Sequence, residues 1–150
     1  MRMRNLIALI SFIVVVLIVA SPALANERLS SKAAVNLAAG KWWELNCPSY
    51  QLTGLGLINF AEKDGVVNEA TFLAKLKASG WLWFLGDGST YKNFSIPLKL
   101  KPESVCGTIL LIIEGCFTFE ERDEKHLNGY YSHSGYCTFQ RAPAPVDAPI

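Results

Sequence analysis

The sequence predicts an α+β domain: a short N-terminal helix and a second helix near residues 68–79, packed on an antiparallel β-meander that can close into a small barrel. Three observations lead there. Hydrophobic residues make up 51% of the chain, aromatic residues 11% and charged residues 18%, a composition that builds a core. Residues 94–101 alternate between apolar and polar in the period of a strand. Residues 68–79 carry the capping residues of a helix.

The first 25 residues have the three parts of a secretory signal peptide. Arg2 and Arg4 precede an apolar run from Leu6 to Ala20, and Ala23-Leu24-Ala25 matches an A-x-A cleavage site. The apolar run is about 15 residues, shorter than the roughly 20 that a spanning helix needs. We therefore expect removal of residues 1–25, a mature chain that begins at Asn26, and no stable membrane anchor after cleavage.

The charge of the mature chain argues against some partners. The leader holds two of the 14 basic residues and none of the 13 acidic ones, so the mature chain has a formal charge of −1. A nearly neutral chain has no basic excess with which to bind nucleic acid. We expect one domain over residues 26–141, with a disordered Pro-rich tail over 142–150.

The N-terminal part predicts a helix followed by a strand. Ser31 can cap a helix from Lys32 to Ala39, and Gly40 can end it. From Lys41 to Cys47 apolar and polar residues alternate, which is typical of a strand. Residues 50–62 favour neither a helix nor a strand.

The segment from Asn68 to Ser79 favours a helix. Asn68 is a good N-cap, Glu69 lies in the first turn, and Gly80 follows the end. An apolar stripe at helical spacing supports this interpretation: Phe72, Leu73 and Leu76. The alternative is a strand, because Phe72, Ala74 and Leu76 also alternate.

The remaining chain predicts strands. Pro97 cannot donate a hydrogen bond to a neighbouring strand, so we expect the strand over residues 94–101 to lie at a sheet edge. Val105 to Ile113 is a continuous apolar run, as expected for one buried strand. The other expected strands cover residues 81–85, 116–121, 127–132 and 136–141.

Two short stretches resemble conserved features of the calycin barrels. Gly40-Lys41-Trp42 opens the first expected strand and resembles a G-x-W motif, while Arg141 lies in the last strand. In calycins the arginine covers the tryptophan and the strands close on themselves. The resemblance covers these two places only and implies a closed sheet in which Arg141 covers Trp42.

The four cysteines predict two disulfides in an oxidising compartment. Cys47, Cys106, Cys116 and Cys137 form an even set with no C-x-x-C pair, so neither a zinc site nor a redox motif is expected. An extended strand would separate Cys106 from Cys116 by about 33 Å. A turn at Glu114-Gly115 would instead place Cys116 beside Ile113. Cys106–Cys116 is therefore the disfavoured pairing, and Cys47 is expected to join Cys106 or Cys116, with Cys137 joining the other.

No catalytic motif stands out. The two histidines, His126 and His133, lie in polar turns; a catalytic interpretation would pair one of them with Ser132 or Ser134 and with Asp123. An acidic run over residues 120–124 is interleaved with Arg122, as in a solvated hairpin end. No phosphate-binding loop or dinucleotide motif is present, and no cofactor or metal is expected.

Closely spaced aromatic residues are the most unusual feature. If residues 81–85 form a strand, Trp81 and Trp83 share one face. They could border a surface that binds a protein or a carbohydrate, with Tyr91 and Tyr131 as neighbours. The sequence thus predicts a small periplasmic or secreted, non-enzymatic binding protein of the inhibitor, immunity or ligand-binding type. The alternatives are an exported hydrolase that uses acids near residues 120–124 and a structural component of the envelope.

Overall fold

The structure is a computed structural model that describes residues 27–109, 113–131 and 135–149. The expected signal peptide lies outside these residues. Eight strands form one continuous antiparallel sheet within them: β2 (Lys41–Cys47), β3 (Leu52–Lys63), β4 (Val66–Ala78), β5 (Lys92–Lys101), β6 (Ser104–Ile109), β7 (Ile113–Asp123), β8 (His126–Tyr131) and β9 (Tyr136–Ala142).

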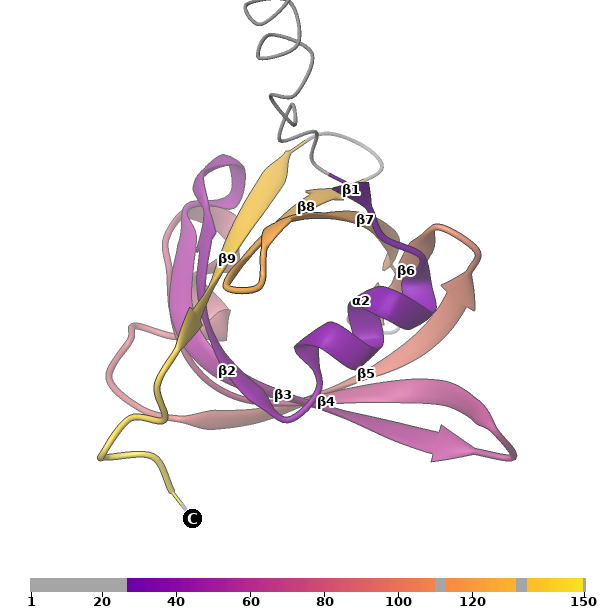
Figure 1. Cartoon of the computed structure of the whole chain (residues 1–150). Coiled ribbons are helices and arrows are strands. Elements are labelled where there is room, and N and C mark those ends of the chain that lie inside the picture. The colour runs from indigo at the N-terminus through magenta and orange to yellow at the C-terminus, as the bar shows by residue number, and fades with distance from the viewer. Residues whose placement is uncertain (1–26, 110–112, 132–134, 150) are drawn as a thin grey trace, which may run out of the picture.

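The eight strands close into a barrel with simple up-and-down order. Each strand pairs with the next along the chain, and β9 pairs with β2 to complete the ring (Figure 1). A short strand, β1 (Glu27–Arg28), pairs with Glu120 and Glu121 of β7, beyond the part of β7 that pairs with β6. The protein is therefore mostly β: the expected meander and its closure are confirmed, and the α+β class is only partly matched.

One α-helix, α2 (Ser31–Ala38), lies across one end of the barrel among the described residues (Figure 1). Its N-cap is Ser30, one residue before the predicted cap, and the Ser30 hydroxyl accepts a hydrogen bond from the backbone N–H of Ala33 at 3.2 Å. Ala34 and Val35 are buried. The helix thus closes this end of the barrel with small apolar side chains.

The helix predicted over residues 68–79 is wrong, because this segment is the strand β4. Every residue from Glu69 to Ala78 has a partner on β3, and the Asp64-Gly65 turn leads straight into the pairing. Ala70, Phe72 and Ala74 line the interior. Closure of the barrel buries this alternating apolar face. The capping residues stabilise a helix of this length only marginally, so the burial decides in favour of the strand.

The strand predicted over residues 81–85 is also wrong. This segment is a 3₁₀ helix, η2 (Gly80–Leu85), between β4 and β5. A 3₁₀ helix has three residues per turn, so Leu82 and Leu85 lie on the same side. Leu82 is buried and Leu85 lines the barrel interior, which leaves Trp81, Trp83 and Phe84 exposed to solvent.

The edge position predicted for Pro97 is wrong, because β5 pairs with β4 on one side and β6 on the other. Pro97 opposes Glu69 in the last pair of the β4–β5 ladder, and the β5–β6 pairs begin only at Leu98. Proline lacks a backbone N–H and cannot donate to a neighbouring strand. At the end of both ladders this missing donor removes the least hydrogen bonding from the sheet.

Both disulfides form, with a pairing that the sequence disfavoured. Cys47 joins Cys137 and Cys106 joins Cys116. The prediction of one strand over 105–113 is wrong: residues 105–109 belong to β6 and Ile113 begins β7, with Ile109 opposite Ile113. The chain reverses between Ile109 and Ile113, before the predicted turn at Glu114-Gly115, so Cys106 lies directly opposite Cys116.

Candidate ligand cavity inside the barrel

The inner face of the barrel combines aromatic rings with very small residues. Ala70 and Ala74 on β4 point inward and are buried. Phenylalanine side chains from β4 itself and from four other strands share the interior with them: Phe60, Phe72, Phe94, Phe117, Phe119 and Phe139. In an eight-stranded barrel, larger side chains on the inner face fill the interior. The small residues therefore leave space between the rings.

Two adjoining cavities occupy this space. One has a volume of about 170 Å³ and lies beneath α2, where Ala34, Val35 and Ala38 form part of its wall. The other has a volume of about 360 Å³ and extends toward the opposite end, where Leu52 and Leu85 line it. Their shared lining residues show that they meet in the middle of the barrel: Ile58, Phe72, Ile96, Phe117 and Phe139.

No ionisable side chain lines either cavity among the described residues. The two cysteines in the wall of the larger cavity, Cys47 and Cys137, are joined to each other. Ser95 and Thr108 are its only hydroxyl-bearing lining residues. A charged group inside would lose its hydration with no partner in exchange. The cavities thus suit an uncharged, apolar molecule.

The two ends of the barrel differ. At the α2 end, the backbone N–H of Ser31 donates to the carbonyl of Pro102, and the backbone N–H of Leu29 donates to the carbonyl of Phe119. These two hydrogen bonds attach α2 and the residues before it to the barrel. The opposite end carries η1 (Pro48–Tyr50) and η2. Leu85 of η2 lines the larger cavity. The η2 end is therefore the candidate mouth.

The buried tryptophan of β2 is Trp43, and not the Trp42 of the expected motif. Trp43 is 2% exposed, and its indole N–H donates to the carbonyl of Ala38 at 3.2 Å. Arg141 opposes Trp43 in the β2–β9 register. Trp42 lies on the outer face with its ring edge-on to Tyr91 at 6.1 Å between centroids. The closed sheet that the resemblance implied is confirmed, whereas the expected cover of Trp42 by Arg141 is wrong, because Trp42 packs against Tyr91 and the register places Arg141 opposite Trp43.

The four aromatic residues predicted to line a binding surface lie in three places. Trp81 and Trp83 are 62% and 71% exposed on η2. Tyr91 lies on the outer wall against Trp42. Tyr131 packs against Phe117 at 5.3 Å between ring centroids and against Tyr50 at 6.0 Å. Partial burial, together with the nearby Tyr131, raises the pKa of Tyr50.

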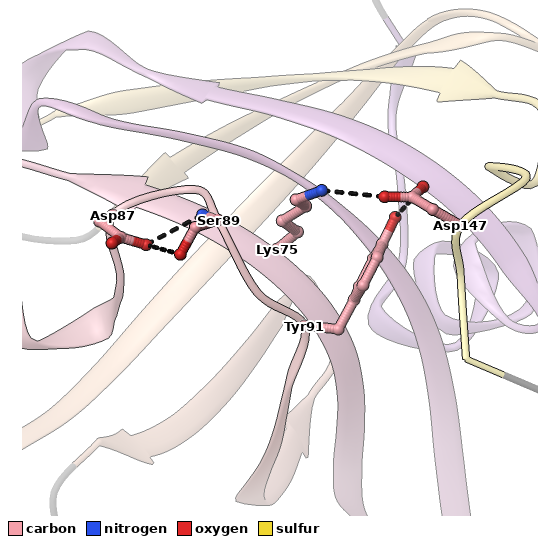
Figure 2. A network of polar contacts seen from close by, with 5 residues as sticks. All are labelled: Lys75, Asp87, Ser89, Tyr91 and Asp147. Atoms are coloured by element: carbon pink, nitrogen blue, oxygen red, sulfur yellow. Dashed lines mark hydrogen bonds and ion pairs between the residues drawn. The ribbon is translucent and has the colours of Figure 1, made fainter.

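A polar cluster on the outer wall holds the C-terminal tail. The Lys75 ammonium donates to the Asp147 carboxylate at 2.9 Å, and the Tyr91 hydroxyl donates to the other oxygen at 3.2 Å (Figure 2). The hydrogen bond from Lys75 lowers the pKa of Asp147 and raises that of Lys75. Separately, Ser89 donates its backbone N–H and hydroxyl to Asp87 and lowers the pKa of that carboxyl. Disorder of the whole tail stays a prediction.

Of the residues considered for catalysis, Asp123 and His126 form a local pair on the β7–β8 hairpin. Asp123 accepts the backbone N–H of Lys125 at 2.8 Å and lies 2.7 Å from Nδ1 of His126. The first contact is the larger cause of the lowered pKa of Asp123. His133, Ser132 and Ser134 lie outside the described residues. Cys106, Glu114 and Cys116 lie close enough to share an ion, but the disulfide occupies both sulfurs.

The cavity-lining residues were missed by reasoning from the sequence. Their signal was present in β4, where Ala70, Phe72 and Ala74 alternate as small and large residues on one face. A helix assignment hides this alternation, because it places these residues on different faces.

Compared with known protein families, with curated proteins and with solved structures, the chain shows no significant match. No helix in the described part of the chain is long and apolar enough to cross a bilayer.

Proposed function

We propose that this chain is an exported, non-enzymatic binding protein that holds a small apolar molecule inside its barrel. The observation that carries the proposal is the pair of adjoining cavities with no ionisable lining residue. The larger volume, about 360 Å³, falls in the range of about 300–1,000 Å³ typical of ligand pockets. The smaller is comparable to an engineered apolar cavity of about 150 Å³ that binds benzene.

The shape of the cavities narrows the ligand class. The larger cavity reaches the η2 end and the smaller one ends beneath α2. A ligand with an alkyl or aromatic body would extend toward α2, while any polar group would remain near the mouth, where water and the Tyr50 and Tyr131 region are close. Burial of its apolar surface would supply most of the affinity.

Export is supported by the leader and by the disulfides. Arg2, Arg4 and the apolar run match the pattern of a signal peptide, and two disulfides fit an oxidising compartment. A stapled barrel with a preformed cavity loses little conformational entropy when it binds.

The test uses N-phenyl-1-naphthylamine, an uncharged probe whose fluorescence rises in apolar surroundings. We expect saturable binding with one site per chain. Ala74→Phe places a ring in the larger cavity and should weaken binding by roughly tenfold or more. Thr71→Phe adds the same ring to the outer face of the same strand and should leave binding unchanged.

Two outcomes would reject an internal site: fluorescence that rises without saturation, or equal binding by the Ala74→Phe and Thr71→Phe variants. If Ala74→Phe fails to fold, as judged by circular dichroism, Ala74→Val provides the smaller version of the same change. It should reduce affinity by a smaller factor.

A further inference from the structure

The exposed surface of η2 is the largest cluster of aromatic side chains on the outside of the described barrel. Trp81 is 62% exposed, Trp83 71% and Phe84 38%, and the Trp83 and Phe84 rings lie edge-to-face at 6.5 Å. Solvent exposure of three neighbouring aromatic rings is unfavourable unless a partner covers them.

This cluster is held in place by the backbone. The N–H of Ala78 donates to the carbonyl of Gly86 at 2.9 Å, and that of Gly88 donates to Leu76 at 2.8 Å. Leu82 anchors the helix in the barrel end. At Gly86 a Cβ would lie 2.5 Å from the carbonyl oxygen of Leu76, so only glycine permits this close return of the loop. The rings are therefore presented by a fixed support.

The chemistry around the rings favours a lipid surface over a carbohydrate. From Gly80 to Gly86 the segment offers no hydroxyl, amide or charged side chain for sugar hydroxyls. Ser79 and Gln51, which lie beside it, are hydrogen-bonded to each other at 2.8 Å. Tryptophan is enriched where proteins meet the headgroup layer, because its ring is apolar and its N–H is polar. Lys77 and Lys92 on the flanking strands carry charges that suit anionic headgroups, and Asp87, which follows Gly86, offsets one of them.

The position of η2 favours a bilayer over a protein partner. Leu85 belongs to the same helix as the exposed rings and lines the larger cavity. Apolar surface therefore runs from the outer rings to the interior of the barrel. A protein interface has a polar rim on all sides of its centre; here Ser79 and Lys77 border the rings on one side, but Leu85 continues the apolar surface toward the cavity on the other. An apolar molecule that leaves a bilayer at this point would avoid water on its way inside.

We propose that Trp81, Trp83 and Phe84 dock the η2 end of the barrel on the surface of a lipid bilayer, and that the apolar ligand enters from that bilayer. The entry route rests on the proposed function, whereas the docking stands by itself. Because the mature chain is close to neutral, burial of the rings supplies most of the attraction. Docking should thus persist when salt screens charge.

The test is flotation of the exported protein with vesicles of phosphatidylethanolamine and phosphatidylglycerol, after mass spectrometry has verified that the leader is absent. We expect binding that changes less than about threefold between roughly 0.1 M and 0.5 M salt. The Trp81→Ala/Trp83→Ala variant should lose roughly tenfold or more of its partitioning. Val66→Ala, an exposed apolar position at the α2 end, should bind as the parent does.

The same proteins are titrated with N-phenyl-1-naphthylamine in buffer without vesicles, which separates the two proposals. Vesicle binding that depends on the tryptophans supports docking, even where the probe does not bind and the proposed function fails. Failure of the parent protein to float, or equal flotation of the double variant, overturns docking while probe binding upholds the cavity. If the double variant does not fold, Trp83→Ala alone is tested in its place, and it should lose a smaller part of its partitioning onto vesicles.

Discussion

Cys106 lies directly opposite Cys116 across β6 and β7, with their Cα atoms 3.9 Å apart, so this disulfide closes a loop of only 10 residues. The other disulfide spans 90 residues and joins β2 to β9, the two strands whose pairing closes the barrel. A crosslink restricts the unfolded chain more when the loop is longer. The two disulfides should therefore contribute unequally to stability.

Replacing Cys47 and Cys137 with serine should lower the free energy of unfolding by about 4–5 kcal/mol. The matched change at Cys106 and Cys116 should lower it by about 2–3 kcal/mol. Urea denaturation of both variants measures the difference. Equal losses, or a larger loss for the short loop, would show that closure of the barrel does not depend on the long crosslink.

Truncation of Trp43 and of Trp83 to alanine should change the stability of the protein by very different amounts. Trp43 is 2% exposed and bonded to Ala38, so Trp43→Ala should cost about 3–5 kcal/mol of stability. Trp83 is 71% exposed, and Trp83→Ala should change stability by less than about 1 kcal/mol. Thermal unfolding of the two variants decides the matter, and a large loss for Trp83→Ala would place its ring in the core.

How far the sequence predicts this fold depends on whether a segment carries its own signal. The strand from Lys41 to Cys47 and the helix after Ser30 were predicted because local alternation and capping mark them. Residues 68–79 carry both a cap and an alternation, and only the partners on β3 and β5 decide between them. The cavity depends on such long-range pairing, since Ala74 borders empty space only once the barrel has closed.

Removal of the leader is a separate prediction. Mass spectrometry of the exported protein should show a chain that begins at Asn26 and lacks four hydrogens, one pair for each disulfide. Alkylation without prior reduction should label no cysteine. An intact leader, or labelled thiols in the exported protein, would contradict this prediction.

The attachment of the tail through Asp147 should depend on pH. The pKa of Asp147 is lowered in the folded protein, mainly by the hydrogen bond from Lys75. Its contribution is therefore present above the ordinary value of 3.8 and is lost as pH falls through the lowered pKa. The pKa of Lys75 is raised above 10.5, so its contribution is lost only as pH rises through that raised value. The tail should stay docked between these limits.

Asp147→Asn removes the charge that Lys75 pairs with and should free the tail at neutral pH. Hydrogen exchange at Val146 and Ala148 should then be as fast as in the parent protein at a pH below the lowered pKa, after correction for intrinsic rates. Asp87→Asn is the matched control, because Asp87 also has a lowered pKa but bonds only to the nearby Ser89. Equal exchange in the parent and Asp147→Asn proteins at neutral pH would mean that the Lys75–Asp147 contact does not hold the tail.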